Sequence, residues 1–282
     1  MASAAWRIAI AALFLGLPGV ALAADIDSSL PPPVAAKAST AAPDWVVTIG
    51  AEVRAVPAWP GAPTNLYGLT GFPLVALQKP GDPPFFFGAR DGFGVPVLDF
   101  GQLQLGPVGK IEFPRYNNQY SQLNGMGEVP WALQLGAYAV YWPVPWLRLR
   151  GEVRQGLGGE TGVTGDLFAD VIVPLGQWRL SAGPRFEAQS TGAVSPYFSI
   201  NAAQSAATGL PIYAATGGFD SYGAGGQVEY FLNRQWSVHA ITEYERITGS
   251  SANSPLVTVR GSPNQLTFGL GATYTFNMRP LW

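Results

Sequence analysis

Apolar residues alternate with small or polar residues through most of 45–276, and this period of two constrains the fold more than any other feature. Successive side chains of a strand point to opposite faces, so each alternating stretch is apolar on one face only. The stretch 264–276 shows this most clearly, with apolar residues at Leu266, Phe268, Leu270, Ala272, Tyr274 and Phe276. The chain is therefore predicted to be all-β.

The composition indicates where the apolar faces point. A soluble sandwich buries such faces in a core, whereas an outer-membrane barrel turns them toward lipid. Hydrophobic residues make up 48% of the chain and charged residues only 12%, about half the usual globular share. Several faces also carry aromatic residues at their ends, as the girdles at membrane interfaces do. The pattern favours a transmembrane antiparallel up-and-down β-barrel in the outer membrane of a Gram-negative bacterium.

The alternating stretches predict about twelve strands, or ten if two weak stretches are loops. The strong ones are 45–53, 131–141, 147–153, 163–173, 178–188, 228–232, 236–244 and 264–276, and the weak ones are 73–79, 85–93, 98–108 and 196–204. No helical period is present, so one closed sheet is expected. The last strand is predicted to close it by pairing with 45–54.

Connection lengths predict which way the barrel points. The long connections 55–72, 205–221 and 247–263 are rich in Gly, Pro and Ser and are expected to be extracellular, and the short turns 80–84 and 232–235 periplasmic. The stretch 109–130 is also long, yet counting strands from the C-terminus places it on the periplasmic side.

The N-terminus predicts export. Arg7, an apolar run at 8–20 and the small-residue site Ala21-Leu22-Ala23 have the three parts of a signal peptide. Residues 1–23 are therefore expected to be removed, 24–44 to form a flexible periplasmic leader, and 45–282 to form the barrel. The alternation that ends in Tyr274 and Phe276 is similar to the C-terminal signal read during outer-membrane insertion. Membrane lipid and the barrel assembly machinery are thus expected partners, with either Phe276 or Trp282 as the terminal aromatic of that assembly signal.

Several chemistries are disfavoured. The chain has no cysteine and a single histidine, which leaves only carboxylates as further metal ligands. A net charge of −2 and the lack of a basic patch argue against nucleic acid. We therefore expect no cofactor, no metal and no catalytic residue.

Charged residues gather on the faces opposite to the apolar ones. Facing side chains on paired strands lie about 5 Å apart, so arginine–carboxylate pairing is expected between them. The predicted lumen ion-pair network comprises Arg148, Arg150, Glu152, Arg154, Asp166, Asp170, Arg179, Arg185 and Glu187. A predicted acidic lumen wall comprises Glu229, Glu243 and Glu245. Two interpretations follow. The favoured one is a structural ladder of ion pairs that plugs or stiffens the lumen. The other is a pore in which a basic and an acidic wall produce a transverse electric field that orders permeating solutes.

His239 is predicted to point inward, near Ser237 and Glu243. Residues two apart on one strand face lie about 7 Å apart, too far for direct proton transfer from serine to histidine. His239 is therefore interpreted as a lumen residue that is hydrogen-bonded to Glu243 or Glu245.

Four phrases in the second half resemble a known family. The residues 151–159 read GEVRQGLGG, 198–213 contain FSI, AQSA and TGLPIY, 246–257 contain RITG and SPLV, and 261–276 end in GLGATYTF. In this order and spacing they are similar to signatures of the MltA-interacting protein / OmpV (MipA/OmpV) family of outer-membrane proteins. Glu160, Ser250 and Asn253 depart from the family, in which His, Asp and Asp are common at these positions. An outer loop has thereby lost charge.

The resemblance implies an outer-membrane barrel, in the best-known case a scaffold that joins a murein-degrading lytic transglycosylase to a murein synthase. From it we expect a non-enzymatic scaffold for cell-wall machinery, with these two enzymes as partners. A narrow outer-membrane channel for small solutes is the first alternative, and an outer-membrane hydrolase using His239 the second. Residues 24–44 and 109–130 are candidate partner-binding segments by location alone.

Overall fold

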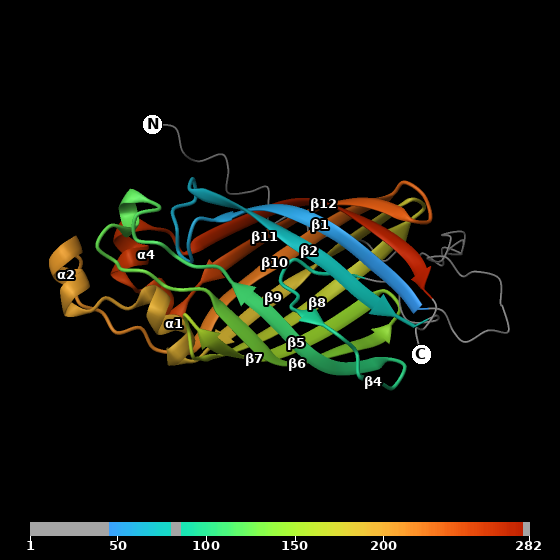
Figure 1. Ribbon diagram of the computed structural model, residues 1–282, viewed down its shortest axis with the longest axis horizontal. Helices are drawn as coiled ribbons and strands as arrows, with labels where there is room; N and C mark the ends of the chain where they lie inside the picture. The colour runs from blue at the N-terminus through green and yellow to red at the C-terminus, as the bar shows by residue number, and fades with distance from the viewer. Residues whose placement is uncertain (1–44, 80–85, 279–282) are drawn as a thin grey trace, which may run out of the picture. The chain divides into compact units, whose positions relative to one another are not determined.

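A computed structural model describes residues 45–79 and 86–278. The predicted signal peptide and leader, the 80–84 turn and Trp282 lie outside the described residues. The described chain forms one antiparallel sheet that curls into a barrel (Figure 1). Its ten long strands are β1 Trp45–Pro57, β2 Tyr67–Gln78, β5 Leu103–Glu112, β6 Ala132–Val144, β7 Leu147–Gly158, β8 Val163–Leu175, β9 Trp178–Gln189, β10 Gly218–Phe231, β11 Trp236–Ile247 and β12 Asn264–Met278.

The predicted class and the pairing of the first with the last strand are confirmed. β12 pairs antiparallel with β1, with Ala51 opposite Ala272, and the other strands follow in chain order down to β5. Two short strands, β3 Phe93–Gly94 and β4 Leu98–Asp99, both pair with β5 and bring the sheet to twelve strands.

The barrel has two distinct ends. We call one the turn end, where the short connections 145–146, 176–177 and 232–235 join neighbouring strands. The other is the loop end, with the long connections 58–66, 113–131, 190–217 and 248–263. At the turn end Trp236 packs on Tyr274 with ring centroids 4.9 Å apart, and Tyr274 stacks on Phe276 at 5.8 Å.

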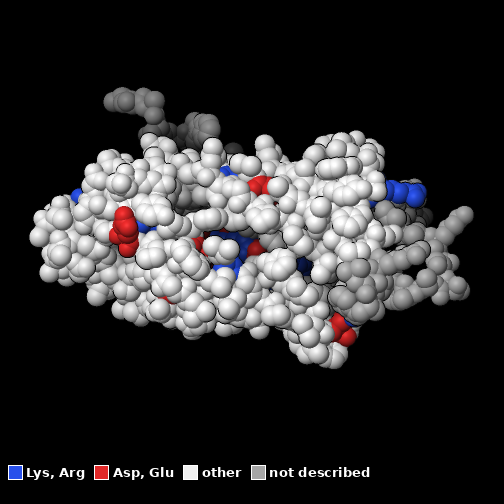
Figure 2. Space-filling view, viewed as in Figure 1, with Lys and Arg blue, Asp and Glu red and all other residues white. Residues whose placement is uncertain are grey.

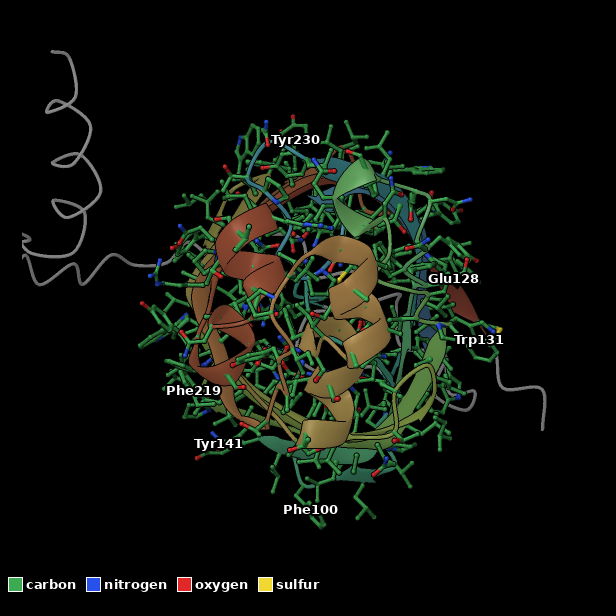
Figure 3. The ribbon with its side chains drawn as sticks, turned by 90° about the vertical axis from the view of Figure 1, so that its left-hand side faces the viewer. Phe100, Glu128, Trp131, Tyr141, Phe219 and Tyr230 are labelled. Atoms are coloured by element: carbon green, nitrogen blue, oxygen red, sulfur yellow. The ribbon has the colours of Figure 1, made fainter. Side chains whose placement is uncertain are left out.

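Helices and loops cover the loop end, where no helix was predicted. α1 Thr191–Phe198, α2 Ala202–Thr208, α3 Gly249–Ala252 and α4 Pro255–Arg260 lie in the connections after β9 and β11. Asn201 caps α2 by accepting from the backbone of Gln204, whose side chain accepts in return from the backbone of Asn201. None of the helices in the described ranges is long and apolar enough to cross a membrane. Viewed from the loop end, the helices lie across the barrel opening, while Trp131, Tyr141 and Phe219 point outward (Figure 3).

The predicted strand at 196–204 is therefore wrong, and this error explains the anomaly of the 109–130 stretch. Each strand crosses the membrane once, and the sides are counted from the C-terminus. One strand too many therefore reverses the predicted side of every connection that precedes it in the chain. The structure places 113–131 at the loop end, where Leu123 and Met126 pack with Trp59 and Ile200 in one buried cluster. The predicted periplasmic position of 109–130 is thus corrected.

The second false strand is 85–93: of its described residues, 86–93, only Phe93 belongs to a strand, the short β3. The segment 86–92, which we call the lumen insert, instead enters the barrel interior. This error cancels the first one for the connection 55–72, which does lie at the loop end, although β2 begins within it at Tyr67. The prediction of a fully closed sheet is also corrected, because no described strand pairs with the free edge of β2.

The gap follows from strand direction. The lane formed by β3 and β4 runs antiparallel to β5, and β2 runs antiparallel to β1. Ten long strands and this lane make eleven positions around the wall, so one pair of neighbours must run parallel. That pair is β2 and the β3–β4 lane, and we call the gap between them the seam.

Side-chain directions follow the predicted alternation. Leu135, Val153, Leu167 and Leu270 are large exposed apolar residues on the outer surface, whereas Arg148, Arg154, Asp166 and Asp170 are buried on the inner face. Hydrocarbon outside favours the former, and only paired charges can be buried at low cost. The outer face is thus apolar and the lumen is charged.

Candidate functional site

The centre of the lumen holds a row of charged residues on β7. Arg148, Arg150, Glu152 and Arg154 occupy alternate positions, so all four point inward, and all are buried. The register of β7 with β8 sets Arg148 opposite Asp170 and Glu152 opposite Asp166. The ion pair of Arg148 with Asp170 follows directly from that register, whereas Asp166 is paired diagonally by Arg154, whose own cross-strand partner is Thr164.

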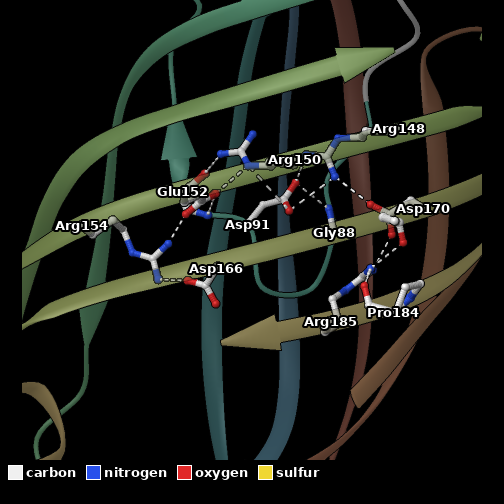
Figure 4. A network of polar contacts seen from close by, with 12 residues as sticks. Gly88, Asp91, Arg148, Arg150, Glu152, Arg154, Asp166, Asp170, Pro184 and Arg185 are labelled. Atoms are coloured by element: carbon white, nitrogen blue, oxygen red, sulfur yellow. Dashed lines mark hydrogen bonds and ion pairs between the residues drawn. The ribbon is translucent and has the colours of Figure 1, made fainter. Parts of the chain in front are cut away.

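Asp170 links three strands. Its Oδ2 accepts a hydrogen bond from Arg148 Nη1 of β7 at 2.9 Å, and its Oδ1 accepts one from Arg185 Nη2 of β9 at 2.5 Å (Figure 4). Arg154 likewise joins strands, since it donates to Asp166 Oδ2 at 2.5 Å and also pairs with Glu152. Asp170 thus contacts two guanidinium groups, whereas Glu152 and Asp166 both contact the guanidinium of Arg154.

The lumen insert carries two charged residues that sequence reasoning missed. Asp91 accepts from Arg148 Nη2 at 2.5 Å and lies 3.9 Å from Arg150 Nε. The backbone of Gly92 is held as well, because its N–H donates to Glu152 Oε1 at 3.0 Å and its carbonyl accepts from Arg150 Nη2 at 3.0 Å. The insert therefore docks on β7 through both side chain and backbone.

Arg90 points to the opposite wall. Its guanidinium pairs with Glu243, lies 2.7 Å from Glu245 Oε2 and lies 3.4 Å from Glu187 Oε2. Glu243 and Glu245 belong to β11, whereas Asp91 docks on β7. Two consecutive residues of opposite charge thus tie the insert to both sides of the lumen. The sequence does carry a signal: an Arg-Asp pair between Gly88 and Gly92 interrupts the alternation that predicts a strand at 85–93.

A third attachment comes from β1. Arg54 Nη1 donates to the carbonyl of Ala89 at 2.5 Å and pairs with Glu52. Glu52 Oε2 also forms a hydrogen bond of 2.8 Å with His239 Nε2. The predicted partners of His239, Glu243 and Glu245, are therefore wrong: both carboxylates face Arg90, and β1 brings Glu52 closer to the imidazole.

The remaining predicted residues form a separate pair. Arg179 Nε donates to Glu229 Oε2 at 2.9 Å, so this arginine of β9 binds the predicted acidic wall and not the acidic strand β8. Ser237 Oγ donates to Glu229 Oε1 at 2.6 Å and lies 2.7 Å from Thr273 Oγ1. The serine hydroxyl donates to Glu229 and not to His239, so it is not arranged as a nucleophile with His239 as its base.

Near the loop end Glu160 and Arg115 are buried, and neither contacts a counter-ion among the described residues. Glu160, one of the departures from the family pattern, accepts from Gln134 Nε2 at 2.5 Å, and burial raises the pKa of its carboxyl. Arg115 donates to the carbonyls of Tyr197 and Pro196 at 2.7 and 3.3 Å, and burial lowers its pKa to about 10. Arg115 thereby fastens the 113–131 connection to α1. Ser250, another departure, accepts from the backbone N–H of Thr216 at 2.9 Å.

The geometry limits what the lumen can do. Arginine and carboxylate groups of β1, β7, β9 and β11 contact the insert. Figure 4 shows the β7 side, where Arg148 joins Asp91 of the insert to Asp170 of β8. Within the described ranges, no group of three or more His, Asp or Glu residues is arranged to hold a metal ion. The arrangement is that of an internal brace, in which charges of the insert contact charges of opposite sign on the wall.

Comparisons with known proteins place the chain among outer-membrane barrels. The model of the family described as MltA-interacting protein MipA matches residues 49–276. No sequence among the curated proteins matches the chain.

Solved structures of outer-membrane proteins are also similar. The COG4313 outer membrane channel from Pseudomonas putida F1 has 12% identity and a TM-score of 0.44, over 84% of this chain and 97% of that one. OmpT of Vibrio cholerae has 10% identity and a TM-score of 0.36, over 86% and 99%. OprG from Pseudomonas aeruginosa has 12% identity and a TM-score of 0.28, over 83% and 96%.

Proposed function

We propose, because this chain belongs to the MltA-interacting protein MipA family, that it is a non-enzymatic outer-membrane scaffold that links a murein lytic transglycosylase to a murein synthase. The protein is an outer-membrane β-barrel, and the family is described by its interaction with MltA. Murein lies on the periplasmic side of this membrane, so the partners would meet the barrel at its periplasmic end.

The observation that carries the proposal is the brace inside the lumen. Arg90 and Asp91 of the lumen insert are tied to opposite walls, so the space that a solute would cross is occupied by buried ion pairs. Because the brace occupies the lumen, the outer surfaces of the barrel are better placed than the lumen to carry its function. This supports the scaffold over the narrow channel.

The expected partner surface is the turn end. Short turns mark the periplasmic side of bacterial barrels, and the connections 145–146, 176–177 and 232–235 lie at this end. Residues 24–44 precede β1, which begins there at Trp45, and they stay a candidate for partner binding. The connection 113–131 is withdrawn as a candidate because it lies at the loop end.

Affinity capture tests the scaffold. Tagged protein isolated from cell envelopes in mild detergent is expected to retain a lytic transglycosylase and a murein synthase, identified by mass spectrometry. Deleting 24–44 after the predicted cleavage site is expected to lower this retention, whereas Asn117→Ala at the loop end, the matched control, should leave it unchanged. Failure of the intact protein to retain any murein enzyme would overturn the scaffold.

The hydrolase alternative has its own test. Because Ser237 donates to Glu229 and His239 contacts Glu52, neither is arranged to activate the other. The purified barrel and its His239→Ala variant are therefore expected to hydrolyse a short-chain p-nitrophenyl ester equally slowly, at the rate of detergent alone. A rate above that background which falls with His239→Ala would restore the enzyme interpretation.

A further inference from the structure

The seam in the barrel wall is the starting point. β2 and the β3–β4 lane run parallel, and no described strand pairs with the outer edge of β2. Open sheet edges are avoided in hydrocarbon because their backbone groups stay without hydrogen bonds. The seam is thus a place in the described wall where a molecule from the membrane can meet polar groups of the protein.

A pocket of about 100 Å³ lies at this seam. Val75 and Leu77 of β2 line it on one side and Phe93 and Pro96 on the other, while Tyr138 and Trp142 of β6 form part of its floor. Val75 and Phe93 are exposed on the outer surface, whereas Tyr138 and Trp142 are buried. Figure 2 shows a hollow in this face of the barrel, in which Lys or Arg and Asp or Glu side chains are visible. The pocket therefore connects the lipid side with the charged lumen.

The inner end of the pocket carries aromatic rings beneath guanidinium groups. Arg148 lies over the ring of Phe86 at 5.2 Å and Arg150 over that of Tyr138 at 4.3 Å, and all four residues line the pocket. A guanidinium group attracts the face of an aromatic ring, so these stacked groups are suited to bind a further flat ring. Among the described residues, the hydrogen bonds of Arg150 use Nε and Nη2, which leaves Nη1 as a donor directed away from Glu152.

The charges at this end are already balanced. Both Arg148 and Arg150 contact Asp91. In addition, Arg148 contacts Asp170 and Arg150 contacts Glu152. An additional anion gains little there, and a charged molecule would not reach the seam through hydrocarbon. An apolar cavity of about 150 Å³ holds benzene, so a pocket of about 100 Å³ limits an occupant to at most one ring, part of which would extend through the open side.

The geometry points to a binding site, entered sideways from the membrane, for a small uncharged aromatic molecule with one hydrogen-bond acceptor. The ring lies between the β2 edge and Tyr138, and the acceptor meets Arg150. The site is independent of the scaffold proposal, because it uses the wall of the barrel and not its periplasmic end.

Fluorine NMR of the intact barrel in detergent micelles tests the site with 4-fluorobenzyl alcohol as the probe. Wild-type protein is expected to broaden and shift the probe signal, and benzyl alcohol to reverse this more effectively than cyclohexylmethanol or benzoate. Val140→Phe fills the pocket and is expected to weaken binding at least about tenfold, with Val140→Leu intermediate.

The matched control is Ala137→Phe, on the same strand but on its outer face, which is expected to bind the probe as the wild type does. Each variant is first shown to have the β-sheet circular dichroism of the wild type; if Val140→Phe does not fold, the graded effect of Val140→Leu decides. Equal binding by the Val140 variants and Ala137→Phe would mean simple partition into micelles and would overturn the site. Preference for benzoate would overturn its uncharged character.

Discussion

Replacing Asp170 with alanine is expected to lower the free energy of unfolding of the barrel by about 3–5 kcal/mol. Asp170 is fully buried and accepts from Arg148 and from Arg185, which belong to strands on either side of it. Removing one carboxylate leaves two buried guanidinium groups short of a counter-charge. The loss is measured by urea unfolding in lipid vesicles, followed by tryptophan fluorescence.

Glu112→Ala is the control for this prediction. Glu112 pairs with a single cation, Lys110 at 3.1 Å, and both side chains are about one-third exposed; such pairs contribute about 0–1 kcal/mol. Asp170→Asn, which keeps the shape but removes the charge, is expected to lie between the two. If Asp170→Ala costs no more than Glu112→Ala, the ion pairs do not brace the barrel.

Replacing Arg90 with alanine is expected to open the lumen. Arg90 faces Glu187, Glu243 and Glu245. Without it, three carboxylates repel one another and the insert loses its attachment to the β11 wall. In planar bilayers the variant is expected to show stepwise conductance at least about tenfold above the wild type, with cations favoured by the acidic wall.

Arg234→Ala, in the exposed turn between β10 and β11, removes one arginine outside the lumen and is expected to leave the conductance unchanged. The experiment also decides between the two interpretations of the lumen. Stepwise, salt-dependent conductance of the wild type itself, equal to that of Arg90→Ala, would contradict the plug and favour the narrow channel.

Much of the wall could be predicted from the alternation alone. The strands from β6 to β9 and β11 and β12 appear where 131–188 and 236–276 alternate, because lipid on one side and charge on the other impose the same period on every strand. Of β10 only the end was predicted, at 228–232: the strand begins at Gly218, within the predicted connection 205–221. The pairing of β12 with β1 also follows, since a barrel must join its ends.

Alternation predicts the wrong structure for short segments, for a different reason. The helices α1 and α2 have eight and seven residues, too few for a helical period to stand out, and Ala and Ser fit a weak strand pattern equally well. The lumen insert is apolar enough to resemble a strand, with Phe86 and Phe87 at its start. Local sequence does not reveal whether a chain continues in the wall or turns inside it.

The candidate site divides in the same way. Residues on neighbouring strands, such as Arg148 and Asp170, can be paired from register alone. The contacts of Arg90 with β11 and of His239 with Glu52 join positions 153 and 187 residues apart, and no local pattern indicates them.

By itself the sequence determined the alternation, and with it an outer face for lipid, an inner face for charge and the closure of β12 on β1. Only the tertiary structure decided that the wall has eleven positions, that β2 and the β3–β4 lane therefore run parallel with a seam between them, and that Arg90 and Asp91 cross the lumen. The physical reason is one of range. Alternation is a property of neighbouring residues. Whether a segment lies in the barrel wall or inside the lumen depends instead on charged residues far apart in the sequence, which meet only when the barrel has formed.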